Sequence, residues 1–116
     1  WMPSPPLVPE ESAIDVQHLG RMTLGEAALE AEVLALFSAQ SGELVARLKA
    51  IPPDAAALAH TLKGSARAIG AFRVAEAALG LEAAMKNSGD IPAAIVLLQH
   101  AVEEAQATIR RMSSRS

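Results

Sequence analysis

The strongest constraint on the fold is a run of apolar residues near the C-terminus that recurs at alternating steps of four and three positions. This spacing places every member on one stripe of a helix, as in helices that pack along their length against other helices. The seven members are Ile91, Ile95, Leu98, Val102, Ala105, Ile109 and Met112. A stripe this long has to be covered by other helices, so the pattern favours a helical bundle.

Helix-breaking and helix-capping residues divide the rest of the chain. Pro52-Pro53 end one helix because proline lacks the amide donor, and Gly70 suits the left-handed end of the next. Asp54 and Asp90 stand where N-caps are expected, and Asn87-Ser88-Gly89 end another helix. The expected long helices span residues 24–50, 54–69, 71–87 and 91–112. Because short loops join antiparallel neighbours, we predict an all-α fold, an up-down antiparallel four-helix bundle with a short additional N-terminal helix.

Two further expectations concern the N-terminal part of the bundle. The short helix is expected at residues 13–22, with Ser12 as its cap. Thr23 and Glu26 have the spacing of a capping box, which predicts that the first long helix begins there.

We expect one core formed from the apolar stripes of the four long helices: Leu36, Phe37, Leu44, Leu58, Leu62, Ile69, Leu98, Val102 and Ile109.

Composition supports the helical interpretation and separates one segment from it. Hydrophobic residues make up 51% of the chain but aromatic residues only 3%, and the abundance of alanine and leucine disfavours a β-sandwich or barrel. Residues 1–12 contain four of the seven prolines. We therefore expect 1–12 to be a disordered arm or an appended remnant, and 13–116 to form the helical domain.

Several classes of function are disfavoured by the same composition. The chain has no cysteine, which excludes disulfides and thiolate chemistry, and a net charge of −3 makes nucleic acid a poor candidate partner. Its three histidines are at least 40 residues apart and lack metal-ligand spacing. Nucleotide-binding glycine motifs, membrane-length apolar runs and a secretory signal are absent from the sequence, so we expect a cytoplasmic protein that binds neither metal nor membrane.

One histidine lies on the side of its helix opposite the apolar stripe. With successive residues ~100° apart around a helix, His60 lies ~180° from the stripe formed by Leu58, Leu62 and Ile69. We therefore expect a solvent-exposed imidazole. The surface residues expected beside it are Ala56, Ala57, Lys63, Gly64 and Arg67.

The neighbours of His60 suit a bulky anion. A glycine inside a helix costs about 0.5–1 kcal/mol relative to alanine, so Gly64 is best explained if something large must approach His60. Lys63 can place its ammonium beside an anion on the imidazole, and Arg67 adds to the positive field. Imidazole, with an ordinary pKa of ~6.5, is a competent nucleophile near neutral pH. A phosphoryl group fits this combination of exposure, space and positive charge.

Residues 58–71 closely resemble the signature of the histidine phosphotransfer (HPt) domain, H-x-L-K-G-S-[SA]-x-x-[hydrophobic]-G-A. The matching residues are His60, Leu62, Lys63, Gly64, Ser65, Ala66, Ile69 and Gly70. Ala68 stands where the family frequently has asparagine, and Arg67 is unusually basic. These departures bear on the choice of partner rather than on the phosphate chemistry.

The resemblance implies a specific role for the chain. HPt domains are four-helix bundles that carry a phosphoryl group between a sensor histidine kinase and the aspartates of response-regulator receiver domains. By position, His60 would be the phosphoacceptor through Nε2, Lys63 would support the phosphoryl charge, and Gly64 would leave clearance for the receiver. The receiver would bring Mg²⁺ and the acidic pocket. The chain itself would then be a carrier without a cofactor, rather than an enzyme.

A second hypothesis is a non-catalytic helical interaction or dimerisation module in which His60 carries no phosphate. Helix 71–87 is apolar on more than one side, with Phe72 and Leu79 off its main stripe. Phe72, like Ala56, Ala57 and Arg67, is a candidate partner-binding residue. An exposed Phe72 or Leu79 would serve partner docking under either hypothesis.

Overall fold

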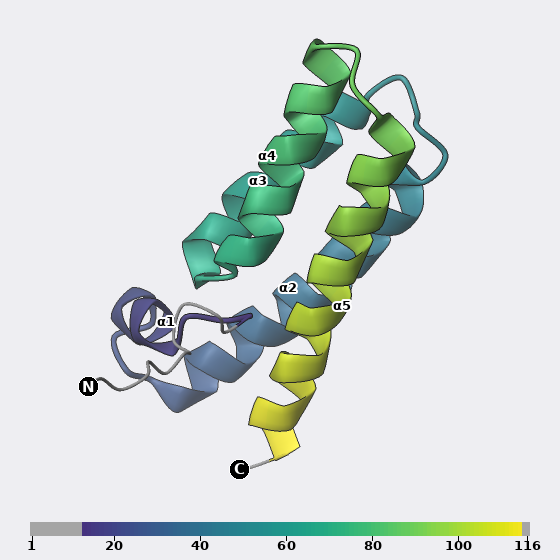
Figure 1. Ribbon diagram of the computed structural model, residues 1–116. Helices are drawn as coiled ribbons and strands as arrows, with labels where there is room; N and C mark the ends of the chain where they lie inside the picture. The colour runs from purple at the N-terminus through teal and green to yellow at the C-terminus, as the bar shows by residue number, and fades with distance from the viewer. Residues whose placement is uncertain (1–12, 115–116) are drawn as a thin grey trace, which may run out of the picture.

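The computed structural model describes residues 13–114, and these residues form five helices and no strand. Figure 1 shows their order along the chain. The helices are α1 (Val16–Met22), α2 (Ala27–Leu48), α3 (Ala55–Ile69), α4 (Phe72–Lys86) and α5 (Ile91–Ser114). The predicted arm over residues 1–12, including Ser12, lies outside the described residues.

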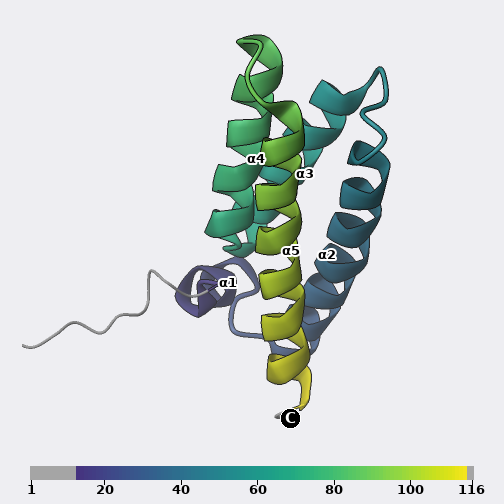
Figure 2. The same cartoon turned by 45° about the vertical axis from the view of Figure 1, so that its right-hand side comes forward.

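The four long helices form a closed ring of neighbours. α2 packs against α3, α3 against α4, α4 against α5, and α5 returns to α2. The short loops reverse the chain after each helix, so successive helices run antiparallel (Figures 1 and 2). The short α1 lies across one end of the bundle and packs against α3. The predicted all-α four-helix bundle with a short N-terminal helix is confirmed.

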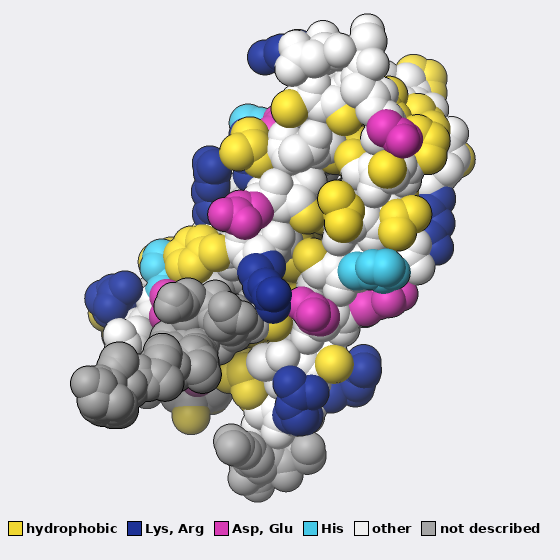
Figure 3. Space-filling model, in the orientation of Figure 1, with side chains coloured by type: hydrophobic (Ala, Val, Ile, Leu, Met, Phe, Trp, Pro, Cys, Tyr) yellow, Lys and Arg dark blue, Asp and Glu magenta, His cyan; other side chains and the backbone are white. Residues whose placement is uncertain are grey.

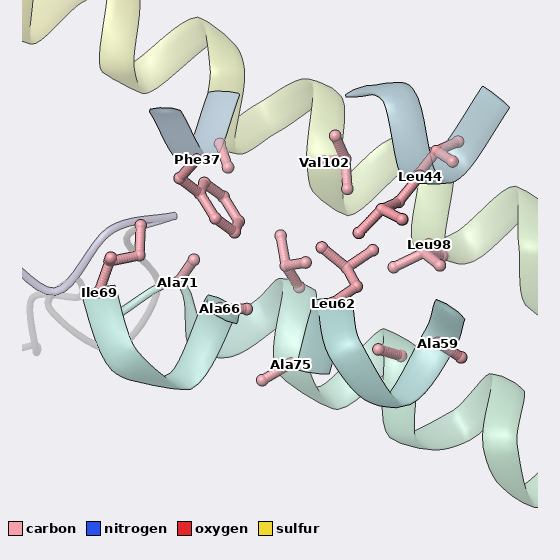
Figure 4. Close-up of a cluster of buried hydrophobic side chains, with 14 of the residues drawn as sticks. Phe37, Leu44, Ala59, Leu62, Ala66, Ile69, Ala71, Ala75, Leu98 and Val102 are labelled. Atoms are coloured by element: carbon pink, nitrogen blue, oxygen red, sulfur yellow. The ribbon is translucent and has the colours of Figure 1, made fainter. Parts of the chain in front are cut away.

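The core lies along the axis enclosed by the four long helices. Figure 4 shows Phe37 and Leu44 of α2, Leu62 of α3, and Leu98 and Val102 of α5 converging there. Leu62 and Leu98 are fully buried. Eight of the nine predicted core residues are buried, and the eight are Phe37, Leu44, Leu58, Leu62, Ile69, Leu98, Val102 and Ile109.

The ninth, Leu36, was predicted wrongly. Its side chain is 67% exposed, because the buried stripe of α2 runs one position out of phase with it, through Leu34 and Phe37. The stripe continues through Ser41, a polar residue that apolar spacing alone does not identify. Ser41 can be buried because its hydroxyl donates a hydrogen bond to the Ser38 carbonyl at 3.3 Å.

The predicted capping box at Thr23 was also wrong. Thr23 closes α1 instead of opening α2: its Oγ1 donates to the carbonyl of Leu19 at 2.9 Å. Leu24 and Gly25 then turn the chain with left-handed backbone angles, φ 56° and 74°. Glu26 occupies the N-cap position of α2 without a side-chain hydrogen bond. At the other end of α1, Asp15 rather than Ser12 provides the cap, accepting from two backbone amides.

The turn between α3 and α4 sets the register of the hairpin that carries the functional site. Gly70 adopts φ 87°, as predicted for a left-handed helix end. A Cβ on Gly70 would also lie 2.9 Å from the carbonyl oxygen of Asp15, so glycine is required on both grounds. The Asp15 amide donates to the Gly70 carbonyl at 2.9 Å, and His18 Nε2 lies 3.1 Å from the Ala68 carbonyl. α1 therefore braces this turn.

Candidate functional site

His60 projects from the outer face of α3. Its side chain is 72% exposed, whereas Leu58 and Leu62 of the same helix are buried. The predicted exposure of the imidazole, opposite the apolar stripe, is confirmed. The histidine therefore has no structural role in the core and is accessible to a partner.

The His60 side chain contacts an acidic residue of another helix. Oε2 of Glu82, on α4, lies 3.2 Å from Nδ1 of His60. Because an ionised carboxylate can only accept hydrogen bonds, Nδ1 is the donor and carries the proton. In the neutral imidazole, Nε2 then holds the lone pair. The contact with Glu82 thus selects one tautomer of an exposed imidazole.

Sequence reasoning missed Glu82, although a signal for it exists. The hairpin of α3 and α4 reverses at Gly70 and Ala71, and His60 and Glu82 lie equally far from Ala71 on either side. Residues equidistant from the turn of an antiparallel hairpin become neighbours. A search for acidic residues at the mirror position of His60 would have found Glu82.

Lys63 also contacts Glu82. Its Nζ lies 2.7 Å from Oε1 of Glu82, and its side chain is only 14% exposed. The pKa of Glu82 is lowered, first by this contact with Lys63; partial burial opposes the effect, and the hydrogen bond with His60 adds to it. The carboxylate is thus held ionised between the lysine and the histidine. In this structure the Lys63 ammonium faces Glu82, and its predicted support of the phosphoryl charge stays a prediction.

Gly64 lies on the exposed face of α3, one turn after His60. A Cβ at this position would meet no atom of the protein within 4 Å. Packing inside residues 13–114 therefore gives no reason for a glycine here. The space above Gly64 is open to an approaching partner.

A groove runs between α3 and α4, beside His60, Lys63 and Glu82. Of the predicted partner-binding residues, Ala56 lines it, whereas Ala57 and Arg67 lie exposed on α3 outside its lining. The groove has a volume of about 500 Å³, and its lining is Ala56, Lys63, Leu79, Glu82, Ala83, Met85, Lys86 and Asn87. Leu79 is 46% exposed, so the groove offers apolar surface as well as charge.

Phe72 is exposed, but the structure does not bring it to His60. It begins α4, ten residues before Glu82 and about 15 Å away along the helix axis. Its ring packs edge-on against His18 of α1, with ring centroids 5.2 Å apart. Its assignment as a partner-binding residue stays a prediction, and it would concern a contact distant from the imidazole.

A second groove lies on the other side of α4, against α5. Figure 3 shows hydrophobic side chains gathered between these two helices, and the residues that line the groove there include Ala77, Ala94, Leu97 and Ala101. His100 also lines this groove. This groove holds neither Lys63 nor Glu82, so it is separate from the site at His60.

Two kinds of feature are absent from residues 13–114. None of the helices in this range is both long and apolar enough to span a bilayer. No three His, Asp or Glu side chains in the same range gather closely enough to hold a metal ion.

Comparison with known proteins agrees with the geometry. A family model described as the Hpt domain matches residues 32–112, which include α3, α4, most of α2 and nearly all of α5. No curated protein and no solved structure gives a significant match. Because the family match covers most of the chain, this protein belongs to the Hpt domain family, whose members are phosphocarrier modules of signalling proteins.

Proposed function

We propose that this Hpt domain relays a phosphoryl group through Nε2 of His60. The group would come from a sensor histidine kinase or from the phospho-aspartate of a receiver domain, and would pass to the aspartate of another receiver. The observation that carries the proposal is the exposed imidazole whose Nδ1 faces Glu82 at 3.2 Å, because this contact leaves Nε2 free and nucleophilic.

The bonds that form and break belong only to the phosphodonor and His60. The lone pair of Nε2 attacks phosphorus, the N–P bond forms, and the P–O bond to the donor aspartate breaks with its electron pair leaving on the carboxylate. The imidazole ring becomes positively charged while Nδ1 keeps its proton. The carboxylate of Glu82, held ionised by Lys63, stabilises that charge. The reverse sequence delivers the phosphoryl group to the next aspartate.

The remaining parts of the reaction are assigned to the partner. The receiver domain supplies Mg²⁺ and its acidic pocket, so the chain acts as a carrier and not as an enzyme. Open space over Gly64 allows the receiver to approach His60. We place this relay in the cytoplasm, where receivers and kinase domains are found.

A phosphotransfer assay tests the proposal. Receiver domains carrying ³²P on aspartate, and separately a sensor kinase with labelled ATP, are mixed with the full chain. We expect label on the chain that survives base and is lost in acid, as a phosphorus–nitrogen bond requires. His60→Gln should abolish labelling, whereas His100→Gln, which changes an exposed histidine on α5, should not.

Two results would contradict the relay. Wild-type chain that takes no label from any receiver or kinase would refute it, and so would labelling that persists in His60→Gln. Stable binding to a partner that His60→Gln leaves unchanged, together with absent labelling, would instead support a non-catalytic interaction module.

A further inference from the structure

The charged residues that line the groove beside His60 do not contribute equally to the electrostatic potential in the groove. Lys63 and Glu82 form an ion pair at 2.7 Å and largely cancel each other. Lys63 is also mostly buried, with 14% of its side chain exposed. A cation in this state is partly neutralised before any ligand arrives, so it offers an anion less positive charge than an unpaired lysine would. Further positive charge for a ligand at His60 has to come from another side chain.

Lys86 is the other cation of the same groove. It lies in the last turn of α4, exposed to solvent, and lines the groove together with Ala56 and Glu82. Lys86 follows Glu82 by four residues, so the two side chains lie on one face of α4, a single turn apart. No acidic side chain within residues 13–114 forms an ion pair with it.

Arg67 is less well placed than Lys86. It follows His60 by seven residues, about 10 Å along the axis of α3, and does not line the groove. The flexible four-carbon stem of Lys86, by contrast, starts one turn from the carboxylate that contacts His60.

We infer that Lys86 is a second cation, beside Lys63, that meets the phosphoryl group at Nε2 of His60 and draws its anionic donor towards the groove. This inference rests on the proposed function. Lys86 forms and breaks no bond in the transfer. It neutralises part of the charge on the phosphoryl oxygens while the N–P bond forms and the P–O bond breaks. Lys63 also positions Glu82, with which it pairs at 2.7 Å.

The test compares three variants of the full chain in transfer from a labelled phospho-receiver. Lys86→Ala removes the charge, and Lys86→Arg keeps it. Lys49→Ala is the matched control, because Lys49 is also an exposed lysine at a helix C-terminus but lies outside this groove. Thermal unfolding of each variant verifies that it is folded.

We expect Lys86→Ala to lower the second-order rate constant of transfer about three- to tenfold at low ionic strength, with the loss shrinking as salt is added, because an exposed charge acts mainly on association. Lys86→Arg and Lys49→Ala should stay within about twofold of wild type. The lifetime of the isolated phosphohistidine should also fall in Lys86→Ala, a readout that does not depend on docking.

The outcomes separate the two proposals. If wild type accepts no phosphoryl group, the relay fails and this inference fails with it. If wild type is phosphorylated and Lys86→Ala matches it in both rate and lifetime, only the role of Lys86 is overturned. Equal losses in Lys86→Ala and Lys49→Ala would likewise overturn it, because the effect would then come from overall charge.

Discussion

Glu82 places its Oε2 3.2 Å from Nδ1 of His60, although the two residues are separated by 22 positions and lie on different helices. The same carboxylate holds Lys63 through its other oxygen, at 2.7 Å. One side chain of α4 therefore governs both the proton position of the imidazole and the availability of the neighbouring lysine.

Glu82→Gln should slow phosphotransfer. A carboxamide can present either its NH₂ group or its carbonyl oxygen to Nδ1, so the imidazole loses its fixed proton position and the charge that stabilises the phosphorylated ring. We expect a rate about 10- to 100-fold lower, by analogy with the loss seen when the carboxylate that orients a metal-ligating histidine is removed. The rate is measured with a labelled phospho-receiver, and ¹⁵N NMR of His60 reports the proton position. A wild-type rate with a scrambled proton position would show that the contact does not matter for transfer.

Acid should weaken the fold partly through Glu82. The pKa of Glu82 is lowered in the folded protein from the ordinary glutamate value of 4.5, so its stabilising contribution is fully present above that value and is lost as the pH falls through the lowered pKa. The free energy of unfolding is measured by denaturant titration at several pH values below neutrality. Glu82→Gln should lose stability less steeply than wild type below about pH 5. Parallel pH profiles for the two proteins would contradict the assignment.

Lys63→Ala should act through Glu82. Removal of the ammonium takes away the main cause of the lowered pKa, so the pKa of Glu82 should rise, as ¹³C NMR of the carboxyl carbon would detect. Transfer should be slower than in wild type, and its loss should deepen as the pH is lowered, because the carboxylate titrates earlier. An unchanged pKa of Glu82 would show that the ion pair does not persist in solution.

Substitutions of Gly64 should separate folding from transfer. Gly64→Ala should raise stability by about 0.5–1 kcal/mol, because a Cβ there meets no atom of the protein and alanine favours helix. Gly64→Gln should remain folded but transfer slowly, because its side chain fills the space over His60. Melting temperature and transfer rate are measured on the same samples. Equal transfer by wild type and Gly64→Gln would remove the steric argument for glycine.

Leu62→Ala tests the orientation of α3. Leu62 is fully buried on the side of the helix away from His60, so its truncation should cost about 2–5 kcal/mol of unfolding free energy through lost burial and a residual cavity. Denaturant unfolding measures the loss, and Thr61→Ala, on the exposed face of the same helix, is the control. A loss below about 1 kcal/mol would mean that the helix faces the other way.

The helices of this chain are readable from the sequence because their signals are local. Pro52-Pro53, Gly70 and Asp90 act on the backbone within one turn, and the Asp90 side chain does cap α5 by accepting from the amide of Ala93 at 3.0 Å. The outward position of His60 was predictable for the same reason. A residue two positions from two core leucines on a helix has to face away from the core.

Thr23 was wrongly predicted as a helix N-cap and Leu36 as a core residue, because at each position the local sequence is compatible with two structures. Thr23 suits a helix start as well as a helix end, and the choice depended on the left-handed turn through Leu24 and Gly25. In α2, apolar residues occur on more than one face, so which stripe is buried depends on how the helix is rotated against α3 and α5. Ser41, with its hydroxyl satisfied by the Ser38 carbonyl, takes a core position that hydrophobicity alone would not assign to it.

The amino-acid sequence by itself determined the five helices, most of the core, and the exposure of His60 beside Gly64. Only the tertiary structure decided that Glu82 contacts His60, that Lys63 is occupied, and that Lys86 is the exposed cation of the groove. The physical reason is the range of the forces involved. Backbone hydrogen bonding and side-chain periodicity act within a few residues, whereas contacts between helices depend on the register and rotation that close packing of the whole bundle selects.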